Sequence, residues 1–149
     1  MLKKWLSGLL LLAGLMAHTA LFAVDLPAFE ASYILKRGSL HIGSSNIEFR
    51  SANDGSYVYE SRSWPTRWVA WLLKDRLHES SRGSIIANSL RPDAYHYLRT
   101  GGSREREADL SFDWKQNRVK NHVEGSLWEM EIPTGTVDKL ASQLGMMLA

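Results

Sequence analysis

The sequence predicts a mainly β fold: an antiparallel curved sheet, a sandwich or a half-barrel that carries one or two short helices. About seven or eight short segments alternate apolar and polar residues, and turn residues separate them. Two further segments space their apolar residues with the period of a helix. Short alternating segments joined by tight turns are typical of antiparallel sheets that curve into sandwiches or barrels.

The first three strands are predicted from alternation and turn residues. Phe29–Lys36 alternates, Gly38-Ser39 forms a turn, and His41–Arg50 resumes the strand pattern. Asn53-Asp54-Gly55-Ser56 then provides a strong turn signal, because glycine readily takes the positive φ that tight hairpins require. A strand from Tyr57 completes the predicted hairpin.

The next segment changes period and is rich in tryptophan. Trp64, Trp68, Trp71 and Leu72 stand at positions i, i+4, i+7 and i+8, which places them on one stripe of a helix. We therefore predict a short amphipathic helix over Thr66–Leu73.

Strand pattern returns in the second half of the chain. We predict strands over Arg76–Ile86, around Tyr95 to Arg99, over Leu110–Trp114, over Val119–Glu124 and over Ser126–Ile132. The predicted turns between them lie at Asn88–Pro92, Gly101-Gly102 and Lys115-Gln116-Asn117.

The last segment has helical spacing again. Its apolar residues are Val137, Leu140, Ala141, Leu144, Met147 and Leu148. We predict a helix with Thr136 as its N-cap, packed on the sheet through this apolar face. Because the sequence ends at Ala149 on that face, without a polar tail, we expect a truncated chain.

The first 23 residues have the layout of a bacterial secretory signal. Lys3 and Lys4 form a positive region, Trp5–Met16 is a Leu-rich core, and Ala20–Ala23 offers a cleavage point. The core is shorter than the roughly 20 residues of a membrane span. We therefore predict export to the periplasm, a single domain over residues 24–149, and no transmembrane anchor after cleavage.

Charge and cysteine content exclude several classes of protein. Without Lys3 and Lys4 the 18 basic residues become 16, which equals the 16 acidic residues. A nucleic-acid-binding domain would keep a basic surplus, so nucleic acid is not an expected partner. The absence of cysteine excludes disulfides, thiolate chemistry and a lipid-modified N-terminal cysteine.

Several short motifs resemble one exported bacterial family. They are Phe29-Glu30-Ala31-Ser32-Tyr33, Gly43, Tyr57-Val58-Tyr59, Glu79-Ser80-Ser81-Arg82-Gly83, Leu90-Arg91-Pro92 followed by Tyr95, and Pro133–Leu140, in which Asp138 begins a helix. On these motifs the chain resembles the family known as domain of unknown function 3108. The resemblance implies an envelope protein dominated by antiparallel sheet, without an established activity and without catalytic residues to transfer.

No motif predicts catalysis, a metal or a cofactor. His41, His78, His96 and His122 stand singly in predicted strands, without the spacing of a helical or hairpin metal site. The serines form no Gly-x-Ser-x-Gly elbow. We interpret these histidines as surface or half-buried strand residues, and we predict no metal ligands and no catalytic residues.

One pair of carboxylates leaves an enzymatic alternative. Glu129 and Glu131 share a strand face, as the acid and base of a glycoside hydrolase would. The same pair is also typical of the solvated face of an edge strand.

The tryptophan segment is the best candidate site. The candidate ligand-binding residues are Trp64, Trp68, Trp71 and Leu72. Arg67 and Lys74 flank them, as in a helix that lies at a membrane surface or covers an acyl-binding cavity. We favour the interpretation that the stripe covers the open side of the sheet and is core. The leading hypothesis is a non-enzymatic periplasmic protein that binds an apolar or lipid-like envelope ligand. The alternatives are an envelope structural or protein-interaction module and, third, a hydrolase of envelope glycans.

Overall fold

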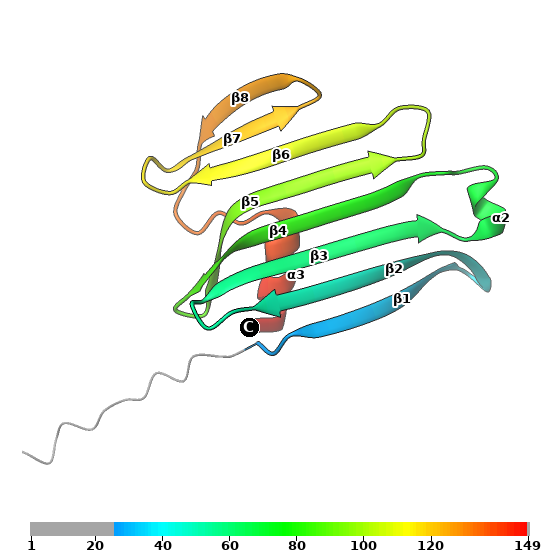
Figure 1. Cartoon of the computed structure of the whole chain (residues 1–149), viewed down its shortest axis with the longest axis horizontal. Coiled ribbons are helices and arrows are strands. Elements are labelled where there is room, and N and C mark those ends of the chain that lie inside the picture. The colour runs from blue at the N-terminus through cyan, green and yellow to red at the C-terminus, as the bar shows by residue number, and fades with distance from the viewer. Residues whose placement is uncertain (1–25, 149) are drawn as a thin grey trace, which may run out of the picture.

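The fold is one antiparallel sheet of eight strands with two short helices (Figure 1). The computed structural model describes residues 26–148, so the predicted signal over residues 1–23 lies outside the described residues. The strands follow one another in chain order: β1 Phe29–Arg37, β2 Leu40–Ser51, β3 Ser56–Pro65, β4 Arg76–Ile86, β5 Ser89–Thr100, β6 Arg106–Asp113, β7 Arg118–Val123 and β8 Ser126–Glu131. The sheet does not close, because β1 and β8 each pair on one side only within residues 26–148. The predicted mainly β class is confirmed.

Tight turns set the strand register, as the sequence predicts. The Asp54-Gly55 turn places Phe49 opposite Tyr59, and Phe29 lies opposite Phe49 on the other side. This row of aromatic residues occupies one face of the sheet, where the Phe29 and Phe49 rings stack at 5.5 Å between centroids. Alternation along each strand then sends the intervening residues to the opposite face.

The predicted turn at Asn88–Pro92 is wrong in length. The turn consists of Ala87 and Asn88, both at positive φ, and Pro92 lies inside β5. Pro92 pairs with Gly83 where a β-bulge shifts the register of β4 against β5. Proline is tolerated at bulges, since the interrupted ladder does not require its missing N–H.

The predicted helix over Thr66–Leu73 is shorter than its periodicity suggests. The helix α2 spans only Arg67–Ala70, and the N–H groups of Leu72 and Leu73 both bond to the carbonyl of Val69. Trp64 is not part of it, because this residue continues the β3 ladder opposite Ser44. The helical spacing of Trp64 with the later residues is therefore coincidental.

The C-terminal helix α3, Lys139–Leu148, packs on one face of the sheet across β3, β4 and β5 (Figure 1). The predicted packing of its apolar face is confirmed. The core consists of Phe49, Tyr57, Tyr59, Leu90, Tyr95, Leu140, Ala141 and Leu144. The predicted cap is wrong: Asp138, not Thr136, accepts the N–H of Ala141 through Oδ1 at 2.9 Å, while Thr136 bonds to the carbonyl of Pro133.

None of the helices between residues 26 and 148 is long and apolar enough to span a bilayer.

Candidate functional site

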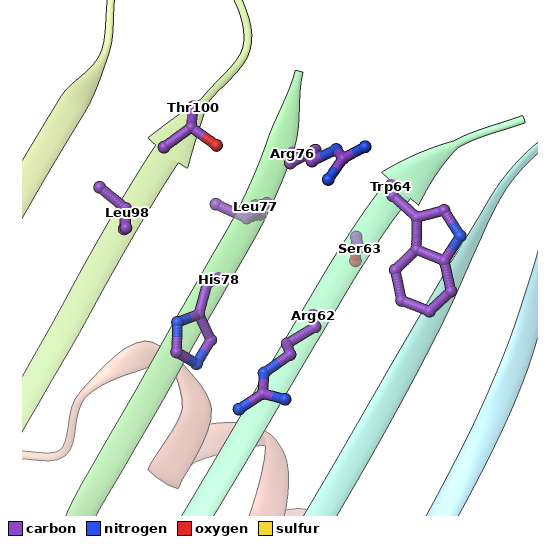
Figure 2. Close-up of a pocket in the computed structure, with 8 residues that line it drawn as sticks. All are labelled: Arg62, Ser63, Trp64, Arg76, Leu77, His78, Leu98 and Thr100. Atoms are coloured by element: carbon purple, nitrogen blue, oxygen red, sulfur yellow. The ribbon is translucent and has the colours of Figure 1, made fainter. Parts of the chain in front are cut away.

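The two faces of the sheet differ in what covers them. Glu79 in β4 faces α3, since its carboxylate accepts hydrogen bonds from the ammonium of Lys139. Its neighbour His78 therefore points to the opposite face, which we call the outer face. Figure 2 shows this arrangement, with α3 behind the strands that carry His78 and Arg62.

The outer face holds a groove of about 560 Å³ at the end of the sheet nearest α2. The lining residues are Arg62, Ser63, Trp64, Arg76, Leu77, His78, Leu98 and Thr100 (Figure 2). Cross-strand pairing brings them together: Arg62 lies opposite His78, and His78 lies opposite Leu98. Three adjacent strands thus contribute to one groove, and the hydrogen-bonded ladder keeps their spacing fixed.

The groove combines an apolar surface with cationic groups. The indole of Trp64 and the side chain of Leu98 supply the apolar surface. Arg62 donates a hydrogen bond of 2.8 Å to Glu60, whereas Arg76 forms no ion pair with any residue in the described part of the chain. The arrangement can therefore receive a hydrophobic chain and leaves a guanidinium available for an anionic group.

A second hollow extends the groove toward α2. Its volume is about 430 Å³, and it shares Trp64, Arg76 and Thr100 with the groove. Ala70 of α2 and Lys74 line its other side. The two hollows together lead from the outer face to the base of the tryptophan segment.

The structure does not bring the four predicted site residues together. Trp64 lines the groove, but Trp68 and Trp71 do not. The indole N–H of Trp68 donates to the carbonyl of His41 at 3.0 Å, and Trp71 is 88% exposed. Leu72 lines a separate hollow that includes Asp75 and Arg99. The favoured interpretation of these tryptophans as core is wrong for Trp68 and Trp71, because neither is buried.

The residues that accompany Trp64 were not found from the sequence. Arg62, His78 and Leu98 come from three strands, and only the strand register shows that they are neighbours. Alternation along the strand predicts that Arg62 lies on the face opposite Tyr57 and Tyr59. The residues that lie beside Arg62 on that face depend on the pairing of β3 with β4, which the irregular segment between these strands determines.

The four histidines lie in strands and are exposed or half-buried, as predicted. One of them, His96, forms a cross-strand group with two acids. His96 in β5 lies opposite Asp109 in β6, with Nδ1 and Oδ1 2.8 Å apart. The donor atoms of His96, Asp109 and Glu107 lie within 4.8 Å of one another, the one group of three such ligands among the described residues. His96 is half-buried and the two acids are more open to solvent, so a divalent cation held by these three side chains would lie at the surface.

A buried polar cluster lies beneath the start of α3. The hydroxyl oxygens of Tyr57 and Ser81 are hydrogen-bonded at 3.0 Å, and the Ser81 hydroxyl donates a hydrogen bond of 2.6 Å to Asp138 Oδ2. Burial raises the pKa of Asp138, partly offset by the hydrogen bond from Ser81. Burial also raises the pKa of Tyr57 above its ordinary value. Ser81 is fully buried under α3, so this cluster holds the helix and is closed to a substrate.

Glu129 and Glu131 lie on β8, the last strand of the sheet. Glu129 forms ion pairs of 3.5 Å with both Arg118 and Lys120 on β7. Both glutamates are exposed, which agrees with the solvated face of an edge strand.

The family model described as Protein of unknown function (DUF3108) matches residues 29–148, and the chain belongs to this family. Three of the residues that carried the resemblance, Glu79, Ser81 and Asp138, lie in the polar contacts beneath α3. No curated protein and no solved structure is detectably similar to the chain.

Proposed function

We propose that this member of the DUF3108 family binds an anionic amphiphile of the bacterial envelope, such as a fatty acid or an acylated molecule with an acidic head, in the outer-face groove. The proposal includes export to the periplasm, which the N-terminal signal pattern supports. The protein acts as a carrier or sensor of this ligand and does not transform it. The observation that carries the proposal is an apolar groove with the unpaired guanidinium of Arg76 in its wall.

The dimensions of the groove support a small amphiphile. Pockets for small ligands typically measure about 300–1,000 Å³ and are lined mainly by apolar side chains with a few polar groups. The groove of about 560 Å³ lies within this range. Trp64 and Leu98 offer contact to a hydrocarbon chain, and the second hollow gives that chain room to continue toward α2.

The charge around the groove supports an acidic head group. The planar guanidinium of an arginine binds carboxylates and phosphates through paired hydrogen bonds. Arg76 has no carboxylate partner among residues 26–148, so a ligand anion does not have to displace one. Thr100, opposite Arg76 in the ladder, adds a hydroxyl to the same wall.

Native mass spectrometry with dodecanoic acid tests this proposal. The protein is purified from cells that express the full chain, and variants Leu98→Glu and Trp128→Ala are compared with it. Leu98→Glu places a charge in the groove, whereas Trp128→Ala alters an exposed residue of β8 far from it. We expect a ligand-sized mass on the parent protein and on Trp128→Ala, and its loss on Leu98→Glu. Equal binding by all three folded proteins would overturn the groove assignment.

A second candidate function is pairing with a partner strand at the edge of the sheet. Within residues 26–148, β8 bonds to β7 alone, and all six of its residues are exposed. Its side chains include Leu127, Trp128 and Met130, which are large and apolar. Such an edge can accept another strand. Crosslinking in intact cells through a photoreactive residue at Met130, compared with one at Lys115, tests this candidate: a partner captured only at Met130 supports it.

A further inference from the structure

The end of the sheet that carries α2 exposes a contiguous run of large apolar side chains. We call residues 67–74 the tip. Its exposed apolar residues are Trp68, Trp71, Leu72 and Leu73, with exposed fractions of 58%, 88%, 78% and 57%. Scattered single apolar residues are normal on a surface, but a contiguous group of this size marks an interaction site.

The tip is held in place at its base. The N–H of Thr66 donates to the carbonyl of Ile42 at 3.1 Å, and its hydroxyl donates to the carbonyl of His41. The indole N–H of Trp68 donates to the same carbonyl of His41. On the other side the backbone of Gly101 lies so close to Lys74 that a Cβ on Gly101 would come within 2.2 Å of the Lys74 carbonyl oxygen. The exposure of Trp71 and Leu72 is thus fixed by the fold.

The surroundings of the tip are strongly basic. The tip and its neighbouring segments, residues 36–47 and 62–76, contain six basic residues and one acidic residue. The basic residues are Lys36, Arg37, Arg62, Arg67, Lys74 and Arg76. The one acid, Asp75, is paired with Arg99, and among the six bases only Arg62 has a carboxylate partner within residues 26–148, namely Glu60. Residues 24–149 as a whole carry equal numbers of acids and bases, so the excess is local.

We propose that the tip docks the protein on the surface of an anionic lipid bilayer, with Trp71 and Leu72 inserted among the head groups. Tryptophan and leucine flanked by lysine and arginine are the residues that favour this interface. The cations at the base would then lie near the lipid phosphates, where each lysine or arginine adds attraction to an anionic surface. The inference goes beyond the proposed groove ligand and does not depend on it.

A bilayer fits the tip better than a protein partner does. The helix α2 lies at the end of the sheet beside the hairpin of β1 and β2 (Figure 1), and the four apolar residues of the tip are exposed. Protein interfaces deplete lysine relative to the rest of the surface, whereas Lys74 lies in the tip and Lys36 in the neighbouring β1–β2 hairpin. The opening of the second hollow beside Ala70 and Lys74 also lies at the base of the tip.

Sedimentation with vesicles tests the docking. Vesicles of phosphatidylcholine alone are compared with vesicles that also contain phosphatidylglycerol, using the protein from cells that express the full chain. The double variant Trp71→Ala, Leu72→Ala is compared with Leu127→Ala, Trp128→Ala. The control removes the same two residue types from the exposed strand β8. Since all four side chains are exposed or nearly so, both variants are expected to fold, which circular dichroism verifies.

We expect binding to the phosphatidylglycerol vesicles to weaken by about tenfold or more in the tip variant and to stay unchanged in the β8 variant. The affinity of the parent protein for vesicles without phosphatidylglycerol should be about tenfold lower than for vesicles that contain it. Added salt should reduce this difference in affinity between the two kinds of vesicle. The proposal would be overturned if the two variants lost vesicle binding equally or if the parent protein bound neither kind of vesicle. It would also be overturned if the tip captured a protein partner and no vesicle. Leu98→Glu should still bind vesicles, so failure of the groove and failure of the tip are distinguishable.

Discussion

The ammonium of Lys139 lies 2.7 and 2.8 Å from the two carboxylate oxygens of Glu79, although the residues are 60 positions apart in the chain. Glu79 is 3% exposed, and the hydroxyl of Tyr95 donates to the same carboxylate at 2.5 Å. Two positions along β4, Ser81 donates to Asp138. The first turn of α3 is therefore fixed to β4 by two polar contacts, while Leu140 and Leu144 supply the apolar packing.

Replacing Lys139 by alanine should destabilise the fold. The substitution leaves Glu79 buried with the Tyr95 hydroxyl as its remaining partner, and an unpaired buried charge is costly. Because the Lys139 side chain is half exposed, we expect a loss of about 1–3 kcal/mol in the free energy of unfolding. Urea unfolding measures it, with Lys115→Ala in an exposed turn as control. An equal effect of the two substitutions would contradict the role of the buried pair.

Because Asp138 caps α3, its replacement by alanine should destabilise the fold. Asp138→Ala removes the acceptor of the Ala141 N–H and one of the two hydrogen-bond partners of the buried Ser81 hydroxyl, which keeps only Tyr57. A lost cap costs about 0.5–2 kcal/mol and a lost hydrogen bond to a charged group about 1.5–3 kcal/mol, so we expect a loss of about 2–4 kcal/mol. Thr136→Ala should cost less than about 0.5 kcal/mol, because its hydroxyl is exposed. Urea unfolding of both variants distinguishes the two caps, and similar losses would contradict the assignment to Asp138.

The pH dependence of stability should report on Asp138. Burial raises the pKa of this carboxyl above 3.8, so the native state still holds its proton at pH values where the unfolded chain has lost it. A raised native pKa favours folding below 3.8, and this contribution is lost as the pH rises through the native pKa. Parent stability should therefore fall, relative to Asp138→Asn, as the pH rises above 3.8.

Asp138→Asn is a suitable reference because it keeps the network intact. Its amide can donate to Ser81 while its oxygen accepts from Ala141, and Ser81 can then donate to Tyr57. Urea unfolding of both proteins from about pH 3 to about pH 7 gives the difference, in which the other titrating groups cancel. A difference that stays constant over this range would mean that the native pKa of Asp138 is not raised.

Strands and turns could be predicted from the sequence because their signals are local. β4 begins and ends at Arg76 and Ile86, as predicted, and the Asp54-Gly55 turn joins β2 to β3. Trp64 shows where local reasoning fails. Its spacing from Trp68 fits a helix, but pairing with β2 keeps the residue in a strand. The tertiary ladder thus overrides the helical period.

The groove and the polar anchor of α3 could not be predicted, because both depend on contacts between distant segments. Leu98 and Arg62 meet only after β4 has paired with β3 and β5. Glu79 was visible as part of a motif, but nothing in the sequence pairs it with Lys139. Residues joined across a sheet have no fixed sequence spacing, unlike residues on one face of a helix.

The close approach of β4 to β5 at the bulge should tolerate no side chain at Gly83. A Cβ at this position would lie 2.2 Å from the Arg91 carbonyl oxygen and 2.6 Å from the Cα of Pro92. Both are backbone atoms, so the strands must separate, and we expect Gly83→Ala to cost about 3 kcal/mol or more. Gly145→Ala in α3 is the matched control. Its Cβ would meet only the Leu90 side chain at 3.9 Å, and alanine favours a helix by about 0.8–1.0 kcal/mol. Thermal unfolding should show opposite signs, and a stabilised Gly83→Ala would contradict the close approach.

The head group of the proposed ligand should depend on Arg76. This residue lines the groove and has no ion pair within residues 26–148, whereas Arg82 lies further along the same strand and outside the groove. A charge-assisted hydrogen bond contributes about 1.5–3 kcal/mol, so Arg76→Gln should weaken dodecanoic acid binding by about tenfold or more. Dodecanol has the same chain without the carboxylate, and its binding should be unchanged. Arg82→Gln should affect neither ligand. Calorimetric titration of both ligands against both variants separates the contributions of chain and head group. If Arg76→Gln weakens acid and alcohol equally, the arginine shapes the groove and does not bind the head, and the anionic class of ligand would have to be abandoned.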